Sequence, residues 1–229
     1  MTIDLNCDVG ELADAGHEAA LMEHITSANI ACGGHAGDEQ TMERTVRLAL
    51  ERGVRIGAHP GYPDRENFGR LEMELSAEEI ERTVLEQIER LEQVARRAGA
   101  AIVHLKPHGA LYNVAARDEA VARAIGAAVA RWNPRVPLFG LAGSRSLEVW
   151  GGMGLEAVAE GFADRRYEAD GSLRSRRLPG ALITDPGEAA AQAVRLAREG
   201  RAQTICVHGD TPGAVAILRA CREALAAAG

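Results

Sequence analysis

Lysine is almost absent from this chain of 229 residues: of its 26 basic side chains, 25 are arginine and one, Lys106, is lysine. Aromatic residues make up only 3% of the sequence, so we expect a core of alanine, valine, leucine and isoleucine. No apolar run approaches the ~18 residues needed to cross a bilayer. The first residues show neither a basic region nor an apolar signal core. We therefore expect a cytoplasmic protein with no membrane partner.

Cysteines and dense basic stretches are also scarce. The four cysteines are scattered without a C-x-x-C pair, which is typical of reduced, buried thiols rather than of disulfides or a structural zinc site. The net charge is −7, and the densest basic cluster, Arg174, Arg176 and Arg177, is too short for a nucleic-acid-binding stripe. We place this cluster on a solvated loop and expect no nucleic-acid partner.

Short apolar runs alternate with helical patterns from end to end of the sequence. About seven strand–helix repeats without a linker predict one α/β domain over residues 1–229, either an open doubly wound sheet or a closed barrel. The chain is slightly short for an eightfold barrel, which typically takes ~250 residues. The pattern also indicates a further short strand at residues 181–184. The predicted strands are residues 3–7, 27–32, 54–58, 102–105, 138–141, 156–159 and 204–207.

The helical segments carry recognisable beginnings and buried faces. Asp38 is well placed as an N-cap, and Ser76 with Glu79 forms a capping box ahead of a long amphipathic pattern. Thr211-Pro212 is expected to open the last helix. The face predicted to be buried after the Asp38 cap consists of Met42, Val46 and Leu50.

Polar side chains collect just past the predicted strands, at the end where active sites lie in both architectures. Packing does not explain so many titratable groups at one end of a sheet. Five of the seven histidines belong to this group: His35, His59, His104, His108 and His208. The acidic members of the group are Asp8, Glu11, Asp38, Asp64, Asp164 and Asp210.

Lys106 is in the turn H-L-K-P-H-G rather than on an amphipathic helix. Arginine and lysine are nearly equivalent on a solvated surface, but not where a compact ammonium is needed. In a chain that otherwise uses arginine, this lysine is predicted to be a site residue. It does not belong to a P-loop, which requires G-x-x-x-x-G-K-[ST].

Six of these segments closely resemble the LamB/YcsF family and occur in the family's order: T-S-A-N-I-A-C-G-G-H-A-G-D, I-G-A-H-P-G-Y-P-D, H-L-K-P-H-G-A-L-Y-N, G-L-A-G-S, F-A-D-R-R-Y-E-A-D-G and I-C-V-H-G-D-T-P-G-A. The resemblance runs from Ile3 to the C-terminus, with a shorter loop than usual after Glu11. It implies an irregular seven-stranded β/α barrel, a distorted TIM-like architecture related to the polysaccharide-deacetylase type.

The resemblance also implies the ATP-dependent 5-oxoprolinase reaction, in which the lactam 5-oxo-L-proline is opened to L-glutamate. The chain would work with two further subunits, B and C, and ATP would be a co-substrate of the complex. Because the sequence has no P-loop, another subunit could supply much of the nucleotide chemistry, or this chain could bind ATP through a less recognisable site.

Chemistry suggests roles for the strand-end residues. Asp8 or a histidine would act as general base on water, and Lys106 would pair with a phosphate or an oxyanion. His59 and His108 would move protons near neutral pH, and Asp164 and Asp210 would orient these two histidines. The predicted catalytic residues are Asp8, His59, Lys106, His108, Asp164, His208 and Asp210. The predicted substrate-binding residues are Asn6, Glu11, Asn29, His35, Ser144 and Arg165.

Two other functions remain open from the sequence. A stand-alone metal-dependent amide or N-acetyl hydrolase would use Asp8, His35, His59 and His108 as donors to a divalent cation. These donors come from different loops with no compact spacing, so the sequence assigns no metal ligand. A non-catalytic carrier would hold a small acid through the glycine-rich loops and Lys106.

Overall fold

The computed structural model describes residues 3–12 and 14–228; residues 1, 2, 13 and 229 of the predicted domain lie outside the described part. Seven parallel strands close into a barrel in sequence order, because β1 pairs with β7 as well as with β2. This confirms the predicted seven-stranded β/α barrel and excludes an open sheet. The strands are β1 (Asp4–Val9), β2 (Ser27–Ala31), β3 (Arg55–His59), β4 (His104–Leu105), β5 (Leu138–Leu141), β6 (Ala157–Phe162) and β7 (Thr204–His208).

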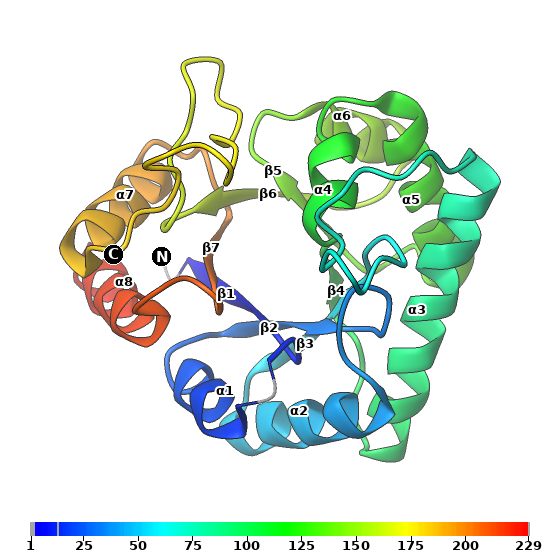
Figure 1. Cartoon of the computed structure of the whole chain (residues 1–229), viewed down its shortest axis with the longest axis horizontal. Coiled ribbons are helices and arrows are strands. Elements are labelled where there is room, and N and C mark those ends of the chain that lie inside the picture. The colour runs from blue at the N-terminus through cyan, green and yellow to red at the C-terminus, as the bar shows by residue number, and fades with distance from the viewer. Residues whose placement is uncertain (1–2, 13, 229) are drawn as a thin grey trace.

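Helices form a ring around the barrel (Figure 1). Most connections contain one helix, but two helices, α4 and α5, lie between β4 and β5, and β4 is only two residues long. These features make the barrel irregular. The helices are α1 (Ala15–Met22), α2 (Glu39–Arg52), α3 (Ala77–Arg97), α4 (Gly109–Ala115), α5 (Glu119–Trp132), α6 (Arg145–Gly152), α7 (Pro186–Arg198) and α8 (Ala214–Ala228).

The apolar core lies between the helices and the strands, and it is mainly aliphatic, as the composition predicts. On α3, Val84, Ile88 and Leu91 are fully buried. The capping box holds the start of this helix, since Ser76 Oγ accepts from the Glu79 N–H and the Glu79 carboxylate accepts from the Ser76 N–H. The four cysteines are buried and free, as expected for small core residues.

Three local predictions were wrong. Segment 181–184 forms no strand; only Leu182 makes an isolated bridge, to Arg165. The last helix begins at Ala214, because Thr211 turns its hydroxyl toward Asp164 instead of capping a helix. Leu50 is 44% exposed, since eight residues beyond Met42 correspond to about 80° of further rotation around the helix.

Strands β1 and β6 also extend further than predicted, to Val9 and Phe162. The extension of β6 places Glu160 within a strand of the barrel, where its side chain is fully buried. None of the helices formed by the described residues is long and apolar enough to cross a membrane.

Two leucine-to-alanine substitutions test this core assignment. Leu91→Ala removes a fully buried side chain and should lower the free energy of unfolding by ~2–5 kcal/mol. Leu50→Ala, the matched control at an exposed position, should change it by only about 0.5 kcal/mol. Urea titrations followed by circular dichroism measure both values. Equal losses would contradict the assigned orientation of α2 or α3.

Candidate active site

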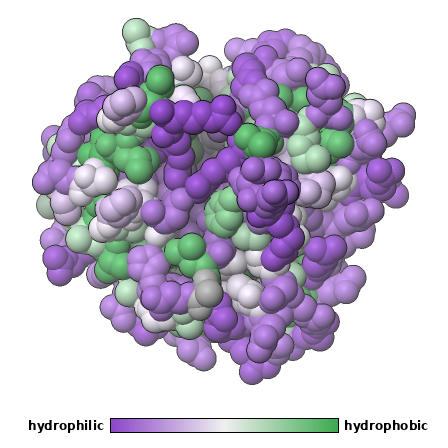
Figure 2. Space-filling model, in the orientation of Figure 1, coloured by the Kyte–Doolittle hydropathy of each residue, from purple (hydrophilic) through white to green (hydrophobic). Residues whose placement is uncertain are grey.

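A cavity of about 950 Å³ opens where the strands end and their following loops begin. Hydrophilic side chains gather around the centre of the face seen in Figure 2, which has the same orientation as Figure 1. The cavity is therefore the candidate active site. Nine of the predicted site residues line it: Asp8, Glu11, His59, Lys106, His108, Ser144, Arg165, His208 and Asp210.

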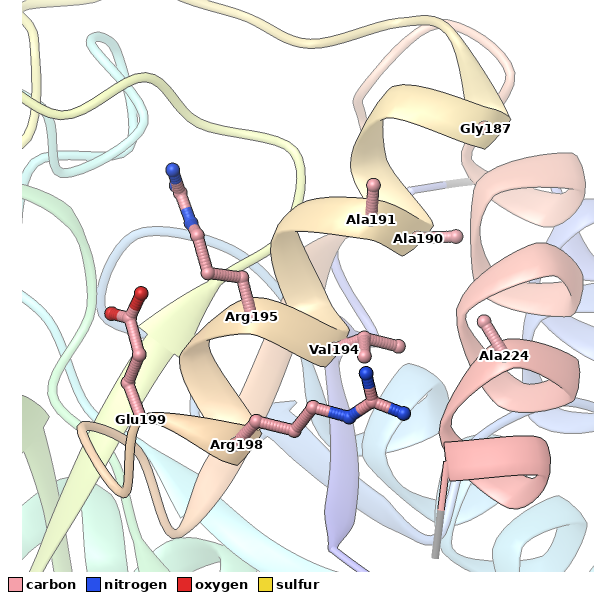
Figure 3. Close-up of a pocket in the computed structure, with 8 residues that line it drawn as sticks. All are labelled: Gly187, Ala190, Ala191, Val194, Arg195, Arg198, Glu199 and Ala224. Atoms are coloured by element: carbon pink, nitrogen blue, oxygen red, sulfur yellow. The ribbon is translucent and has the colours of Figure 1, made fainter.

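A second cavity, of about 600 Å³, lies away from the strand ends, on α7 and α8 (Figure 3). Ala190, Ala191 and Val194 of α7 line it together with Ala224 of α8, and Arg195 and Glu199 lie at its edge. This alanine-rich surface contributes no histidine or cysteine. Its polar groups are limited to arginines and one glutamate at the surface, so the barrel cavity, with its clustered histidines, carboxylates and Lys106, is the stronger candidate.

Lys106 lies on the floor of the barrel cavity and is almost completely buried. Its ammonium donates to Asp8 Oδ1 at 2.8 Å and to Cys206 Sγ at 3.0 Å, and it lies 3.1 Å from Glu160 Oε1. Burial alone would lower the pKa of Lys106, but the carboxylate of Asp8 outweighs burial and holds it well above its usual value. Lys106 is therefore a permanently charged group, fixed by two carboxylates.

Asp8 has the opposite shift. Burial raises the pKa of this carboxyl, but His59 and Lys106 outweigh burial and hold it well below its usual value. A carboxylate of such low basicity is a poor proton acceptor. The geometry thus favours Asp8 as the charge partner of Lys106 rather than as the general base.

Beneath this pair, a chain of hydrogen bonds crosses the barrel interior. Asn29 Nδ2 donates to Asp8 Oδ1 and to Asn6 Oδ1, both at 2.8 Å. Asn6 Nδ2 in turn donates to Glu160 Oε1 at 3.0 Å. Both asparagines are fully buried and are not among the described residues that line the cavity. This placement corrects their prediction as substrate-binding residues: they position the carboxylates.

His104 lies beside Asn29 in the barrel interior and is not among the described residues that line the cavity. Its Nε2 lies 2.8 Å from Asn29 Oδ1, across Gly57, which pairs with both residues in the strand register. A Cβ at Gly57 would lie 2.0 Å from that ring nitrogen, so only glycine leaves room for the imidazole. Burial lowers the pKa of His104 to about 3, and its ring is neutral at physiological pH.

Three more histidines, His35, His59 and His108, surround the Glu11 carboxylate at the edge of the cavity floor. His59 Nε2 lies 3.0 Å from His108 Nδ1, 3.4 Å from Asp8 Oδ2 and 3.7 Å from Glu11 Oε1. His108 Nδ1 lies 3.2 Å from Glu11 Oε1, and His35 Nε2 lies 2.9 Å from the same oxygen. The structure thus brings together residues from different loops that sequence spacing alone could not relate.

The protonation states of these groups differ. Burial lowers the pKa of His59, but Asp8 outweighs burial, so this pKa is raised above its usual value. Burial lowers the pKa of His108 and brings that of His35 to about 3. Burial raises the pKa of Glu11, but the adjoining imidazoles of His108 and His35 outweigh it and lower this pKa. His59 is the histidine that holds a proton most readily here.

His208 lies on β7 beside Asp8, its partner in the strand register, and is oriented by Asp164. Its Nδ1 lies 3.0 Å from Asp164 Oδ2, and Thr211 Oγ1 donates to that oxygen at 2.5 Å. Because Nδ1 faces a carboxylate, it carries the proton, and Nε2 is left as the basic nitrogen. Asp164 was predicted to orient His59 or His108, but it orients His208 instead, and the fully buried aspartate does not itself line the cavity among the described residues.

Asp210 does not orient a histidine, which corrects the prediction for this residue. Its carboxylate is bound by Arg70 from the β3–α3 loop and by Arg176 from the β6–α7 loop, the latter at 3.0 Å. The sequence placed Arg176 on a solvated loop, and this prediction was wrong, because Arg176 lines the cavity. Nearby, Arg165 is buried and its Nε has no hydrogen-bond partner among the described residues.

Sequence reasoning missed three charged residues that form ion pairs with predicted site residues: Glu160, Arg70 and Arg176. A signal existed only for Glu160, because a single carboxylate interrupts the otherwise apolar strand A-V-A-E-G-F. The two arginines are on irregular loops: nothing in its local sequence distinguishes Arg70, and the basic cluster that contains Arg176 was interpreted as solvated. Ser144, a predicted substrate-binding residue, lines the cavity at the start of α6.

Comparisons with known proteins agree with this architecture. The sequence pattern that defines the LamB/YcsF family matches residues 3–229. The chain is 50% identical to a Chloroflexus aggregans protein named as the A subunit of 5-oxoprolinase, over 100% of this chain and 97% of that protein. It is 49% identical to a Methylococcus capsulatus protein of the same name, over 100% and 94% of the two chains.

Among solved structures, a lactam utilization protein from Thermus thermophilus superimposes with a TM-score of 0.93 at 44% identity, covering 100% of this chain and 98% of the other. A T48 deacetylase superimposes with a TM-score of 0.50 at 19% identity, covering 100% and 86%. The latter likeness concerns the fold alone, and it agrees with the predicted deacetylase-type architecture.

The buried neutral His104 predicts a specific acid sensitivity. Between about pH 6.5 and pH 3 the unfolded chain binds a proton at this residue that the folded chain does not, so stability falls as the pH is lowered. His104→Gln keeps an amide to face Asn29 and removes the titration. The fall in unfolding free energy should become shallower by roughly 1.4 kcal/mol per pH unit within this window. Urea unfolding at several pH values measures it, and parallel curves for the two proteins would refute the assignment.

Proposed function

Because the chain belongs to the LamB/YcsF family, we propose that it is the A subunit of an ATP-dependent 5-oxoprolinase and opens the lactam of 5-oxo-L-proline to L-glutamate. The observation that carries the proposal is 50% identity, over the whole chain, to a protein named as that subunit of 5-oxoprolinase. The cavity of about 950 Å³ accommodates a small lactam, and its lining combines an ammonium, imidazoles, carboxylates and guanidinium groups.

An amide carbonyl is a weak electrophile, so ATP is expected to activate it by phosphorylating the amide oxygen. Water then adds to the ring carbon, and cleavage of the carbon–nitrogen bond leaves a carboxyl phosphate and a free amine. A second water hydrolyses the carboxyl phosphate to glutamate and inorganic phosphate. The two steps need a base for water, an acid for the leaving nitrogen and a cation for the developing negative charge.

His208 is suited to the proton transfers. Its Nδ1 is held by Asp164 and its ring lines the cavity, so Nε2 can take a proton from water and return it to the leaving nitrogen. This arrangement supports a histidine as the general base rather than Asp8, which is paired with Lys106.

Lys106 is suited to stabilise the oxyanion. Two of its three contacts are to carboxylates, and the third is to Cys206 Sγ, a weak acceptor. An oxyanion entering the floor can therefore replace the sulfur contact without breaking the ion pairs. Arg165 and Arg176, with Arg70, supply positive charge for the carboxylate or phosphoryl group of the substrate.

The partners follow from the same proposal. The relatives are named as one subunit of an enzyme, which supports a complex, and we propose 5-oxoprolinase subunits B and C as its other members. ATP would be a co-substrate of that complex. We place the complex in the cytoplasm.

Reconstitution tests the function. The chain is purified with subunits B and C of a 5-oxoprolinase, and glutamate formation from 5-oxoproline is followed with and without ATP. We expect ATP-dependent glutamate formation by the complete mixture only. Amide hydrolysis by the isolated chain would favour the stand-alone hydrolase, and tight 5-oxoproline binding without turnover would favour the carrier. A complete mixture that is inactive, beside an active known complex, would refute the proposal.

Lys106 provides a sharper test within that assay. Lys106→Arg should be nearly as damaging as Lys106→Met, with turnover reduced by roughly 10²–10³. Arginine keeps the charge, but its broad planar guanidinium does not fit a site enclosed by Asp8, Glu160 and Cys206.

The matched control is Arg123→Lys, an exchange of the same two residue types in an exposed pair with Glu119. It should leave turnover unchanged, because surface ion pairs contribute little. Thermal melts check the folding of every variant. Turnover close to that of the unmodified protein in Lys106→Arg would show that only charge matters at this position.

A further inference from the structure

We infer that Glu11, His59 and His108 form a binding site for a divalent transition-metal ion of the zinc type, at the edge of the cavity floor. All three residues line the cavity. They are contributed by three separate parts of the chain, after β1, at the end of β3 and after β4. The site does not depend on the proposed reaction, and its test uses the isolated chain without substrate.

The first argument is the triangle formed by the three donor atoms. Glu11 Oε1, His59 Nε2 and His108 Nδ1 are separated by 3.0, 3.2 and 3.7 Å. Zinc binds imidazole nitrogen and carboxylate oxygen at about 2.0–2.2 Å, which gives edges of roughly 3.3–3.5 Å in a tetrahedron. The triangle therefore has the dimensions of one face of such a coordination shell before any ion is added.

The second argument concerns which ring nitrogens carry protons. His59 Nδ1 faces the carbonyl oxygen of Lys106 at 2.7 Å, and His108 Nε2 faces that of Phe68 at 2.9 Å. A carbonyl only accepts, so both outer nitrogens are N–H donors. In neutral rings the two inner nitrogens then present lone pairs to each other and to carboxylates. This clustering of acceptors requires a cation or an additional proton at its centre.

Outer nitrogens bonded to backbone carbonyls are also the usual support of histidine metal ligands, because such bonds fix the tautomer and the ring orientation. Here one of the carbonyls is presented by a strained residue. Phe68 has a φ of 57°, in the left-handed region that residues with side chains rarely adopt. Strain of this kind persists where surrounding structure imposes it, commonly at functional sites.

His35 supports the site without being a ligand. Its ring is stacked on that of His108, with centroids 3.5 Å apart and planes within 4° of parallel. An imidazole lone pair lies in the plane of its ring, so the lone pairs of two stacked rings lie in separate, parallel planes and do not converge on one ion. His35 Nε2 instead lies 2.9 Å from Glu11 Oε1 and orients that carboxylate.

The charge balance points the same way. The buried floor contains three carboxylates, Asp8, Glu11 and Glu160, and a single permanent cation, Lys106, which leaves a formal charge of −2 when the imidazoles are neutral. A divalent ion compensates this charge. Two imidazoles and one carboxylate select zinc-like or iron-like ions over magnesium, which prefers an all-oxygen shell.

Metal binding to the isolated, chelator-treated chain tests the inference. Isothermal titration with Zn²⁺ should give one site per chain, and Mg²⁺ should bind far more weakly. Co²⁺ at one equivalent should produce a visible absorption band typical of low coordination numbers. Zinc should also raise the melting temperature, because a ligand that binds the folded state stabilises it.

Substitutions identify the ligands. His59→Ala and His108→Ala should each abolish the stoichiometric site, whereas His35→Gln should weaken it by roughly 10–100-fold, as expected of a supporting residue. His24→Ala, at a histidine outside the cavity, is the matched control and should bind Zn²⁺ as the unmodified protein does.

A crystal of the unmodified protein soaked in Zn²⁺ provides a check that does not depend on the folding of any variant. Anomalous density between Glu11, His59 and His108 is expected. Absence of stoichiometric Zn²⁺ binding, or anomalous density elsewhere with none at these residues, would overturn the inference. Equal binding by the His59→Ala, His108→Ala and unmodified proteins would also overturn it.

Discussion

The contact of one buried ammonium with two carboxylates organises this barrel. Lys106 holds Asp8 and Glu160 on the floor of the cavity, and Asn6 and Asn29 connect the same carboxylates from below. A buried pair of this kind is costly to desolvate and becomes tolerable only when the surrounding hydrogen bonds are satisfied. The polar strand residues therefore stabilise one another through hydrogen bonds. Beneath the cavity floor they occupy the barrel interior, which in such barrels is usually filled by branched apolar side chains.

The periodic parts of this fold were predictable from the sequence, because they depend on local patterns. Alternating strands and helices indicated the β/α class, and the Ser76 capping box marked the start of α3 correctly. The family resemblance then distinguished the closed barrel from the open sheet. Local errors arose where tertiary contacts override the pattern, as at Thr211, whose hydroxyl binds Asp164. Helix rotation produced the error at Leu50, whose spacing from Met42 only approximates the helical repeat.

The candidate site was predictable as a group but not residue by residue. Parallel strands bring their carboxyl ends together, so histidines and aspartates at those ends were expected to meet. Which of them faces the cavity depends on strand register and loop geometry, which spacing does not encode. Asn6 and Asn29 lie below the cavity for this reason, and Asp210 faces arginines. Glu160 escaped notice because β6 continues past its apolar start.

The ion pairs of Arg70 and Arg176 with Asp210 are more sensitive to ionic strength than the ion pairs of the cavity floor. These side chains are partly exposed at the cavity mouth, whereas the ion pairs of the floor are buried. Dissolved salt screens exposed charges over about 8 Å at physiological strength but reaches buried pairs far less. Added salt therefore loosens the mouth while leaving the floor intact. In this molecule the charge balance at the cavity mouth and that at the floor therefore respond separately to the surrounding solution.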